Sequence, residues 1–332
     1  MNVLIIGGTG LISTGIVKAL LARKATVTVY NRGQTDDRLE PAVQRLHGDR
    51  NDFATFEKSF ASSKYDAVID MICFKPDQAA SDIRAFAGKC GHFVFCSTVC
   101  TYGNTQTIVP TTEATPQRPH SEYGKNKLAC EKTFLDAYHT GAFAGTGLTI
   151  LRPSHTYGPG GSIINNLGWG PTFVDRLRKG KPILVSGDGH GLWQSAYSED
   201  VGVGFAAALG RKACFGECYN IVADEVVTWD DYTRRTAEGV GAPPPKIVHA
   251  PTDLLLRIDR KRYQGLDEIF QFHGVYSNDK IHRDVPEFRN VTPYVEGVRR
   301  TVAWLDQHNK LQPWDSDPFE DKIIAAIEAI KV

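Results

Sequence analysis

The chain begins with an apolar run that leads straight into a glycine-rich turn. Residues 3–6 read Val-Leu-Ile-Ile, as a fully buried parallel strand does, and Gly7 and Gly10 follow them. Apolar residues then recur at helical spacing from Ile12 to Leu20. Glycines between a first strand and a helix let the backbone approach a pyrophosphate, which the unpaired N–H groups at the start of the helix attract. The turn therefore predicts an α/β chain that binds a dinucleotide.

Strand-like apolar runs alternate with helix-like stretches along most of the chain. The runs cover 2–6, 26–30, 67–72, 92–96, 148–152 and 218–222. Such alternation is typical of a doubly wound parallel sheet, so we expect a Rossmann-type α/β fold with a nucleotide-binding domain over 1–152.

The composition changes after Arg152. Residues 158–172 are rich in glycine and proline, which suits an irregular loop that faces a substrate. Shorter helical patterns follow from about 225 and are broken by prolines at 243–245 and 251. We expect residues 153–332 to form mainly a smaller substrate-binding domain.

Charge and cysteine usage narrow the class of protein. Lys plus Arg and Asp plus Glu number 38 each, so no net charge attracts nucleic acid or an acidic membrane. Seven scattered cysteines without a Cys-x-x-Cys pair fit free thiols rather than a disulfide framework or a zinc site. With no apolar run long enough for a bilayer and no signal peptide, we expect a cytoplasmic protein without a metal.

A tyrosine and a lysine, Tyr123 and Lys127, stand four residues apart in Ser-Glu-Tyr-Gly-Lys-Asn-Lys. On a helix this spacing puts both side chains on one face, one turn apart. A phenol with a pKa of about 10 exchanges protons poorly at neutral pH, whereas a nearby ammonium favours the phenolate. We therefore expect Lys127 to lower the pKa of Tyr123 and the pair to transfer a proton.

Three motifs in this order resemble the extended short-chain dehydrogenase/reductase superfamily, and more narrowly its NAD-dependent epimerase/dehydratase family, which acts mainly on sugar nucleotides. They are Gly7-x-x-Gly10-x-x-Ser13, Thr98-x-x-x-Tyr102-Gly103 and Tyr123-x-x-x-Lys127. Ser13 replaces the usual third glycine, which is a mild change because serine is small. The resemblance covers roughly the first 220 residues. It implies that 196–222 returns to the Rossmann sheet.

The resemblance also implies catalytic roles. Thr98 is expected to hold the reacting oxygen while Tyr123 moves the proton, and Lys127 to hold the nicotinamide ribose as well. Cys100 stands where GDP-mannose 3,5-epimerases and GDP-fucose synthases carry an acid or base, although a small buried hydrophobe is the alternative. Sugar-nucleotide 4,6-dehydratases carry Asp-Glu where this chain has Val99 and Cys100, which argues against that dehydration.

The end of the second strand bears on the cofactor, which is NAD or NADP. Asn31 and Arg32 stand where NAD-specific sites usually have an acid, which favours NADP, unless Arg32 only stacks on adenine or faces solvent. Asp49 matches the family's acid at the adenine, with a turn-capping role as the alternative. The residues expected at the cofactor are Gly7, Gly10, Leu11, Ile12, Asn31, Arg32, Asp49, Arg50, Tyr123 and Lys127.

Two departures from the family pattern concern the substrate. His155 replaces an asparagine that helps to hold the substrate's phosphates, and Trp193 replaces an arginine that grips the diphosphate. Arginine binds phosphate bidentately and tryptophan does not, whereas an indole offers area for stacking on a sugar. A structural role is the alternative for each residue expected at the substrate, namely His155, Asn165, Asn166, Trp169, Trp193 and Gln194.

Three functions are compatible with these patterns. The first is an epimerase or oxidoreductase that acts on a sugar or sugar-nucleotide hydroxyl through a transient ketone. The second is a dehydrogenase or ketoreductase with net redox turnover. The third follows from residues 192–194, which resemble atypical members that include chloroplast RNA-binding proteins; the neutral charge balance and the intact Tyr-Lys pair argue against a nucleic-acid partner.

Family members commonly pair through the helix that carries the Tyr-Lys motif. We therefore expect a homodimer, with apolar surface on that helix from Leu128, Phe134, Leu135 and Tyr138. Packing inside one chain is an equal explanation for most of these side chains.

Overall fold

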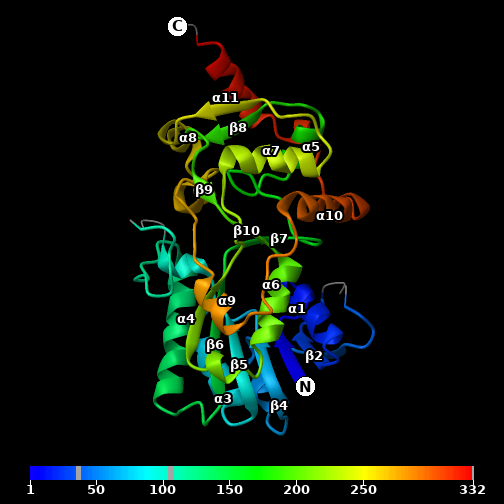
Figure 1. Ribbon diagram of the computed structural model, residues 1–332, viewed down its shortest axis with the longest axis vertical. Coiled ribbons are helices and arrows are strands. Elements are labelled where there is room, and N and C mark those ends of the chain that lie inside the picture. The colour runs from blue at the N-terminus through cyan, green and yellow to red at the C-terminus, as the bar shows by residue number, and fades with distance from the viewer. Residues whose placement is uncertain (35–38, 104–107, 331–332) are drawn as a thin grey trace.

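The computed structural model describes residues 1–34, 39–103 and 108–330. Figure 1 shows an elongated molecule, with a sheet and the N-terminus in its lower part and helices and the C-terminus in its upper part. Strands β7 (His155–Tyr157) and β10 (Ser195–Tyr197) pair in parallel where the two parts meet. In the described stretches, no helix combines the length and the apolar character needed to cross a membrane.

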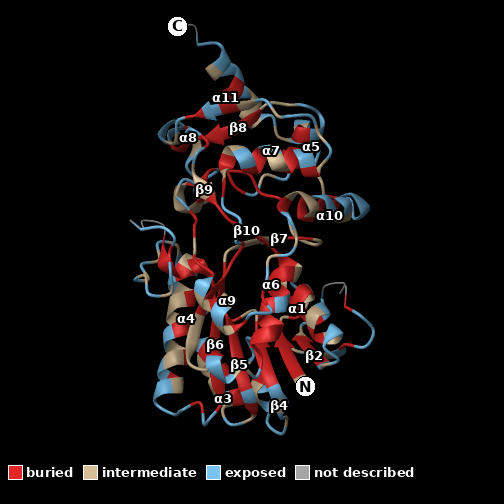
Figure 2. Cartoon of the chain, viewed as in Figure 1, coloured by how far each residue is buried: buried red, intermediate tan, exposed pale blue. Residues whose placement is uncertain are grey.

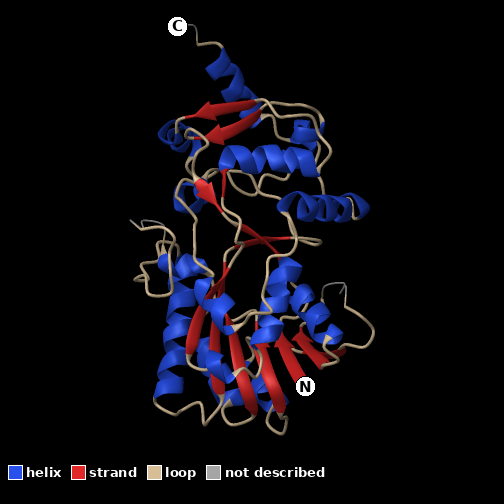
Figure 3. Ribbon diagram, in the orientation of Figure 1, coloured by secondary structure: helices blue, strands red, loops and turns tan. Residues whose placement is uncertain are grey.

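Seven parallel strands form the central sheet, drawn in red at the bottom of Figure 3. Their order is β11-β6-β5-β4-β1-β2-β3. This arrangement confirms the Rossmann-type α/β fold. The strands are β1 (Asn2–Ile6), β2 (Thr26–Asn31), β3 (Gln44–His47), β4 (Tyr65–Asp70), β5 (Cys90–Cys96), β6 (Gly147–Pro153) and β11 (Glu217–Ile221).

All six strand-like runs seen in the sequence lie in this sheet, because a parallel sheet covered on both faces buries continuous apolar runs. The seventh strand, β3, reads Gln-Arg-Leu-His and is largely exposed at the sheet edge. Strand β3 forms because its backbone pairs with β2, and its own residues carry no apolar pattern that would predict a strand. Strand β11 pairs with β6, which brings the chain back to the sheet after an excursion into the upper part.

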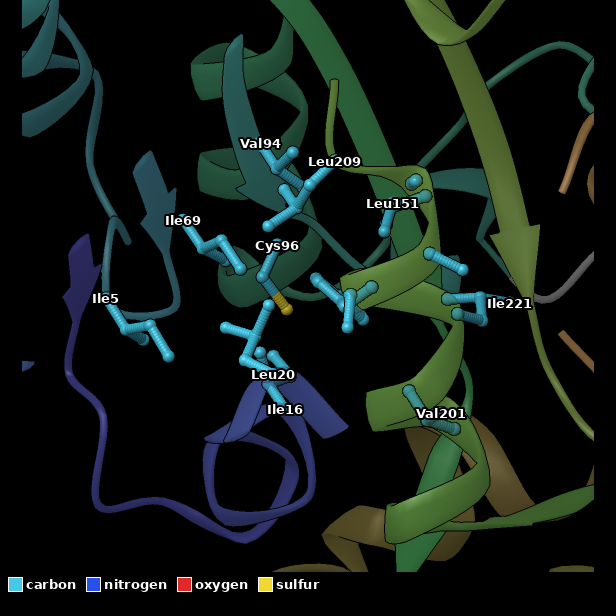
Figure 4. Close-up of a cluster of buried hydrophobic side chains, with 14 of the residues drawn as sticks. Ile5, Ile16, Leu20, Ile69, Val94, Cys96, Leu151, Val201, Leu209 and Ile221 are labelled. Carbon is cyan, nitrogen blue, oxygen red and sulfur yellow. The ribbon is translucent and has the colours of Figure 1, made fainter. Parts of the chain in front are cut away.

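Alternate side chains of the strands enter two different cores. On one face, Val3 and Ile5 pack with helices α1 (Leu11–Ala22) and α6 (Ser198–Ala208). Figure 4 shows Ile16 and Leu20 of α1 in this cluster, with Val201 of α6 beside it. On the other face, strand residues pack with α2 (Phe53–Ser59), α3 (Pro76–Phe86) and α4 (Glu122–His139).

Two glycines let α1 and α6 touch backbone to backbone. A Cβ on Gly15 would lie 2.5 Å from the carbonyl oxygen of Ser198, and one on Gly202 would lie 2.3 Å from the carbonyl carbon of Gly15. These distances are too short for any side chain. The close crossing fixes the returning segment against the nucleotide-binding part.

The upper part has a hydrophobic core of its own, seen as buried red segments in Figure 2. Two short strand pairs, β8 with β13 and β9 with β12, lie among its helices. How the chain divides into domains at 152 stays a prediction. The elements of this part are α5 (Phe173–Arg178), β8 (Ile183–Ser186), β9 (Leu192–Trp193), β12 (Val227–Thr228), α7 (Trp229–Gly239), β13 (Ile247–Ala250), α8 (Thr252–Asp259), η3 (Leu266–Phe270), α10 (Tyr294–Gln307) and α11 (Phe319–Glu328). Helix α9 (Asp279–Asp284) lies instead in the lower part, where its Ile281 joins the core that α1 and α6 cover.

The helix expected at a dimer interface, α4, uses much of its apolar surface inside the chain. Phe134 is fully buried, and Leu135 and Tyr138 pack against the same core cluster. Leu128 is half-buried. Intramolecular packing therefore accounts for most of these side chains, and the homodimer stays a prediction.

Candidate active site

Three cavities follow one another along the carboxyl ends of the sheet strands. We call them the cofactor cavity, the reaction cavity and the aromatic pocket, with volumes of about 380, 440 and 150 Å³. Gly7, Gly10 and Phe74 line both of the first two, and Thr98, His155 and Trp169 line both of the last two. A ligand that spans the first two can therefore meet one held in the third. Ligands of α/β sheets bind at this edge.

The cofactor cavity lies over the glycine-rich turn. Gly7 has a φ of +87°, and a Cβ there would lie 2.5 Å from a methyl group of Ile72, so only glycine fits. Helix α1 begins after Gly10, and no side chain caps its first N–H groups, which leaves them for an anion. The Tyr30 hydroxyl at the cavity wall is buried without a partner among the described residues. These features fit a bound dinucleotide.

Asn31, Arg32 and Asp49 all line the cofactor cavity. The Asn31 side-chain oxygen accepts the backbone N–H of Gly33 at 2.8 Å, and Arg32 is exposed. Asp49 accepts hydrogen bonds from the backbone and side-chain nitrogens of Asn51 at 2.8 and 3.0 Å, which is the turn-capping role. Cofactor contacts by these three residues stay predictions, as do those of Leu11 and Ile12 on the wall of the reaction cavity.

The guanidinium of Arg50 is bonded to side chains and backbone of the protein itself. It donates to Asp70 at 2.5 Å, to Asp82 at 2.9 Å and to the carbonyl of Gln78 at 3.0 Å. Burial by itself lowers the pKa of Arg50, but the two carboxylates outweigh burial and raise that pKa overall. Arg50 therefore shapes the wall of the cofactor cavity, and a direct contact with the cofactor stays a prediction.

Tyr123 and Lys127 lie in the first turns of α4, whose start is capped by Ser121 accepting the Gly124 N–H at 3.1 Å. Lys127 is 1% exposed, and its ammonium donates to the carbonyls of Cys73 and Cys96 at 2.8 and 2.7 Å. The loop that follows β4 and the end of β5 therefore hold this lysine through their backbone carbonyls. Both residues line the reaction cavity.

The electrostatic effect on Tyr123 differs from the sequence-based expectation. Desolvation of the phenol raises the pKa of Tyr123 above its usual value, nearby Cys96 and Cys100 raise it further, and a hydrogen bond with the Thr98 side chain lowers it. The expected lowering by Lys127 is wrong here, because that ammonium lies 6.0 Å from the tyrosine ring centre and is bonded to two carbonyls. Tyr123 is 45% exposed, and without a bound ligand its phenol carries its proton at neutral pH.

Thr98 ends the stretch after β5 and begins the short helix η1 (Val99–Tyr102). Its hydroxyl accepts the backbone N–H of Cys100 at 3.2 Å, which fixes the side chain beside Tyr123. Desolvation raises the pKa of the Cys100 thiol, with Glu268 adding to the shift. Cys100 thus stays a neutral thiol in the aromatic pocket, suited to give a proton rather than to take one.

The aromatic pocket brings together four of the six residues expected at the substrate: His155, Trp169, Trp193 and Gln194. The other two, Asn165 and Asn166, are buried outside this lining, and contacts between them and a substrate stay a prediction. The Asn165 side chain accepts the N–H of Leu167 at 3.0 Å, and that of Asn166 accepts the N–H of Ser186 at 2.5 Å. Both amides shape the loop.

Two of the pocket residues are tied into the fold. The Nδ1 of His155 and the Nε1 of Trp193 both contact the Ser195 hydroxyl, at 2.9 and 3.0 Å. Desolvation lowers the pKa of His155 to about 4, so its ring is neutral at physiological pH. The Gln194 amide donates to the carbonyl of Ala223 at 2.7 Å and accepts the N–H of Tyr276 at 2.8 Å, so both ends of the amide contact backbone groups. A contact between Gln194 and a substrate stays a prediction.

The sequence held no signal for several residues at these cavities. Phe74 lies between the cofactor and reaction cavities, with the Lys127 ammonium 4.7 Å from its ring centre. Ile269 and Phe270 close the aromatic pocket from the upper part, and Tyr276 closes it beside Tyr102. They lie beyond the stretch with family motifs, and only folding brings them to the ends of β5 and β6.

A Rossmann-type sheet with a dinucleotide cavity beside a threonine, a tyrosine and a lysine defines an enzyme of the extended short-chain dehydrogenase/reductase type. The chain belongs to the NAD dependent epimerase/dehydratase family, whose model matches residues 3–221. The cofactor is accordingly NAD or NADP.

Comparisons with individual proteins leave the reaction open. The chain is 29% identical over 243 residues to 2'-dehydrokanamycin reductase of Streptomyces kanamyceticus, covering 73% of this chain and 68% of that protein. It is 27% identical over 264 residues to chloroplast stem-loop binding protein of 41 kDa b of Arabidopsis thaliana, covering 75% and 65%. The UDP-glucose 4-epimerase of Thermus thermophilus, solved with NAD, has the same fold, with a TM-score of 0.70, 24% identity, and 92% and 99% coverage.

Proposed function

We propose that the protein is an NAD(P)-dependent oxidoreductase that acts on a hydroxyl of a sugar-like substrate through a transient ketone, as an epimerase does. The observation that carries this proposal is that Thr98, Tyr123 and Lys127 line one cavity, with Lys127 one turn along the same helix from Tyr123. The three side chains face the reaction cavity, which adjoins the cofactor cavity. Val99 and Cys100 stand where sugar-nucleotide 4,6-dehydratases carry an aspartate and a glutamate, which argues against 4,6-dehydration.

Each of the three side chains has a separate task. When the alcohol is oxidised, the phenolate form of Tyr123 takes the proton of the substrate hydroxyl, and when the ketone is reduced the resulting phenol returns that proton to the oxygen. The Thr98 hydroxyl holds the reacting oxygen beside the phenol. Lys127 supplies a positive charge that stabilises the phenolate form once it appears. A bound nicotinamide supplies hydride acceptance and donation at the carbon.

Net reduction of a ketone is the second candidate, because the raised pKa of Tyr123 keeps a proton on the phenol. A relative that matches 73% of this chain is named a reductase, which supports the same direction. The two candidates use the same residues and differ in their electron balance. A steady change in the absorbance of the reduced nicotinamide during turnover indicates net redox, and product without that change indicates epimerisation.

The test of both is the substitution Tyr123→Phe, with Tyr138→Phe near the other end of α4 as the matched control. Without a proton donor and acceptor at the reacting oxygen, kcat should fall by roughly 10²–10⁴-fold. The control should retain wild-type turnover. Activity in Tyr123→Phe equal to that of the control would refute the proposal.

A further inference from the structure

We propose, building on the function proposed above, that the aromatic pocket takes the ring of an uncharged carbohydrate that bears no phosphate. Its lining contains two tryptophans, Trp169 and Trp193, together with Phe270 and Tyr276. Within the described chain, none of the residues that line it is a lysine, arginine, aspartate or glutamate. The wall is therefore aromatic and uncharged.

A diphosphate needs cations, and none of the described residues that line the pocket is a lysine or an arginine. His155, which replaces the family's asparagine, is neutral at physiological pH because desolvation lowers its pKa to about 4. Lys127 lines the reaction cavity, and its ammonium already donates hydrogen bonds to two backbone carbonyls. Residues 104–107, the undescribed stretch that follows η1, read Asn-Thr-Gln-Thr and contain no basic residue. Phosphoryl groups in proteins are met by arginine, lysine or helix N-termini.

Trp193 is a fixed wall at the place of the family's arginine. Its ring stacks on Trp229, with centres 4.8 Å apart and an angle of 26°, and lies 5.3 Å from Phe270. Its Nε1 is bonded to Ser195, and 6% of the residue is exposed. A side chain held on three sides cannot swing away to admit a charged group.

Trp169 supplies the open stacking surface. It is 58% exposed although it stands at the junction of the reaction cavity and the aromatic pocket. Its ring meets Phe270 edge to face, with centres 5.2 Å apart. An exposed indole beside Thr98 offers its face to the apolar side of a sugar ring whose hydroxyl reaches the catalytic side chains.

Size and hydrogen-bonding capacity limit the ligand further. The pocket has a volume of about 150 Å³, whereas pockets that hold drug-sized ligands measure roughly 300–1,000 Å³. The Gln194 amide is used by backbone groups, and His155 has its Nδ1 engaged, so its Nε2 is the ring nitrogen left for a ligand. One neutral ring with a few hydroxyls matches this lining.

Binding should be measured separately from turnover. Isothermal titration calorimetry on the Tyr123→Phe variant, loaded with whichever of NAD and NADP it binds more tightly, reports binding without chemistry. The probes are methyl glucopyranoside, methyl galactopyranoside, UDP-glucose, UDP-galactose and UDP. The same titrations are made in that background with Trp169→Ala, with Trp169→Phe, and with Trp314→Ala as a control outside the three cavities.

We expect a methyl glycoside to bind, UDP to give no binding heat, and each UDP-sugar to bind no more tightly than its methyl glycoside. Trp169→Ala should weaken glycoside binding by about tenfold or more, Trp169→Phe should keep most of it, and Trp314→Ala all of it. Binding of UDP, a UDP-sugar preference above about tenfold, equal effects of the two alanine variants, or no glycoside binding would each overturn the inference. Glycoside binding without turnover in the wild type would instead count against the proposed function alone.

Discussion

A buried ion pair behind the active-site loop gives the sharpest test of how the fold holds the catalytic residues. Arg152 at the end of β6 donates to both carboxylate oxygens of Glu131 on α4, at 2.9 and 2.7 Å. It also donates to the Tyr102 hydroxyl at 2.7 Å, and Ser97 donates to the same carboxylate. The two side chains are 4% and 1% exposed. The pair therefore joins α4, β6 and the loop that carries Thr98.

The cost of breaking this pair follows from its burial. Glu131→Gln keeps the shape but leaves a charged guanidinium without a carboxylate, which costs about 3–5 kcal/mol in a buried pair. That is a large share of the roughly 5–15 kcal/mol by which a domain is stable. The matched control is Glu57→Gln, because Glu57 pairs with Arg84 where their side chains are 26% and 53% exposed. An exposed pair contributes only about 0.2–1 kcal/mol.

The assay is urea unfolding at neutral pH, followed by tryptophan fluorescence, with the midpoints compared at a common slope. We expect a much lower midpoint for Glu131→Gln than for Glu57→Gln, and a lower kcat, because Ser97 and its neighbour Thr98 lose their anchor. If Glu131→Gln costs no more than the control substitution, the reasoning from burial is wrong. Loss of activity at unchanged stability would also contradict it.

Two further predictions concern the cofactor and pH. Arg32→Ala should raise the Kd for NADP by about tenfold and leave that for NAD unchanged; tighter binding of NAD by the wild type would refute the preference. His92 accepts the Gly210 N–H at Nδ1 and bonds Thr149 through Nε2, and burial lowers its pKa to about 3. Because this pKa lies below the value of about 6.5 for a histidine in the unfolded chain, the contribution of neutral His92 to stability is complete above about pH 6.5 and is lost as the pH falls. Between pH 7 and 5, the wild type should lose about 2 kcal/mol more of unfolding free energy than His92→Gln, and parallel pH profiles would count against it.

The sequence predicted those features that depend on near neighbours in the chain. The run 3–6 and the glycines after it are a local signal, because burial on both faces of a sheet demands continuous apolar residues. The spacing of Tyr123 and Lys127 was likewise enough to place them one turn apart on a helix. The exposed strand β3 escaped notice because its pairing partner, rather than its own residues, makes it a strand.

The substrate side depended on distant neighbours. The sequence indicated Trp169 and Trp193, but the residues that close the pocket around them, Phe270 and Tyr276, stand far along the chain in a stretch without motifs. Asn165 was expected at the substrate, yet its side-chain oxygen accepts the N–H of Leu167 within its own loop. No rule of sequence spacing predicts that contact.

Local patterns thus determined the Rossmann fold, the glycine turn and the tyrosine-lysine pair, because periodicity and backbone freedom are properties of short segments. Only the tertiary structure decided that Arg50 pairs with two buried carboxylates, and that the pKa of Tyr123 is raised rather than lowered. Those outcomes depend on desolvation and on charged groups from other elements of the fold. Both the desolvation and the nearby charges arise only when the chain folds.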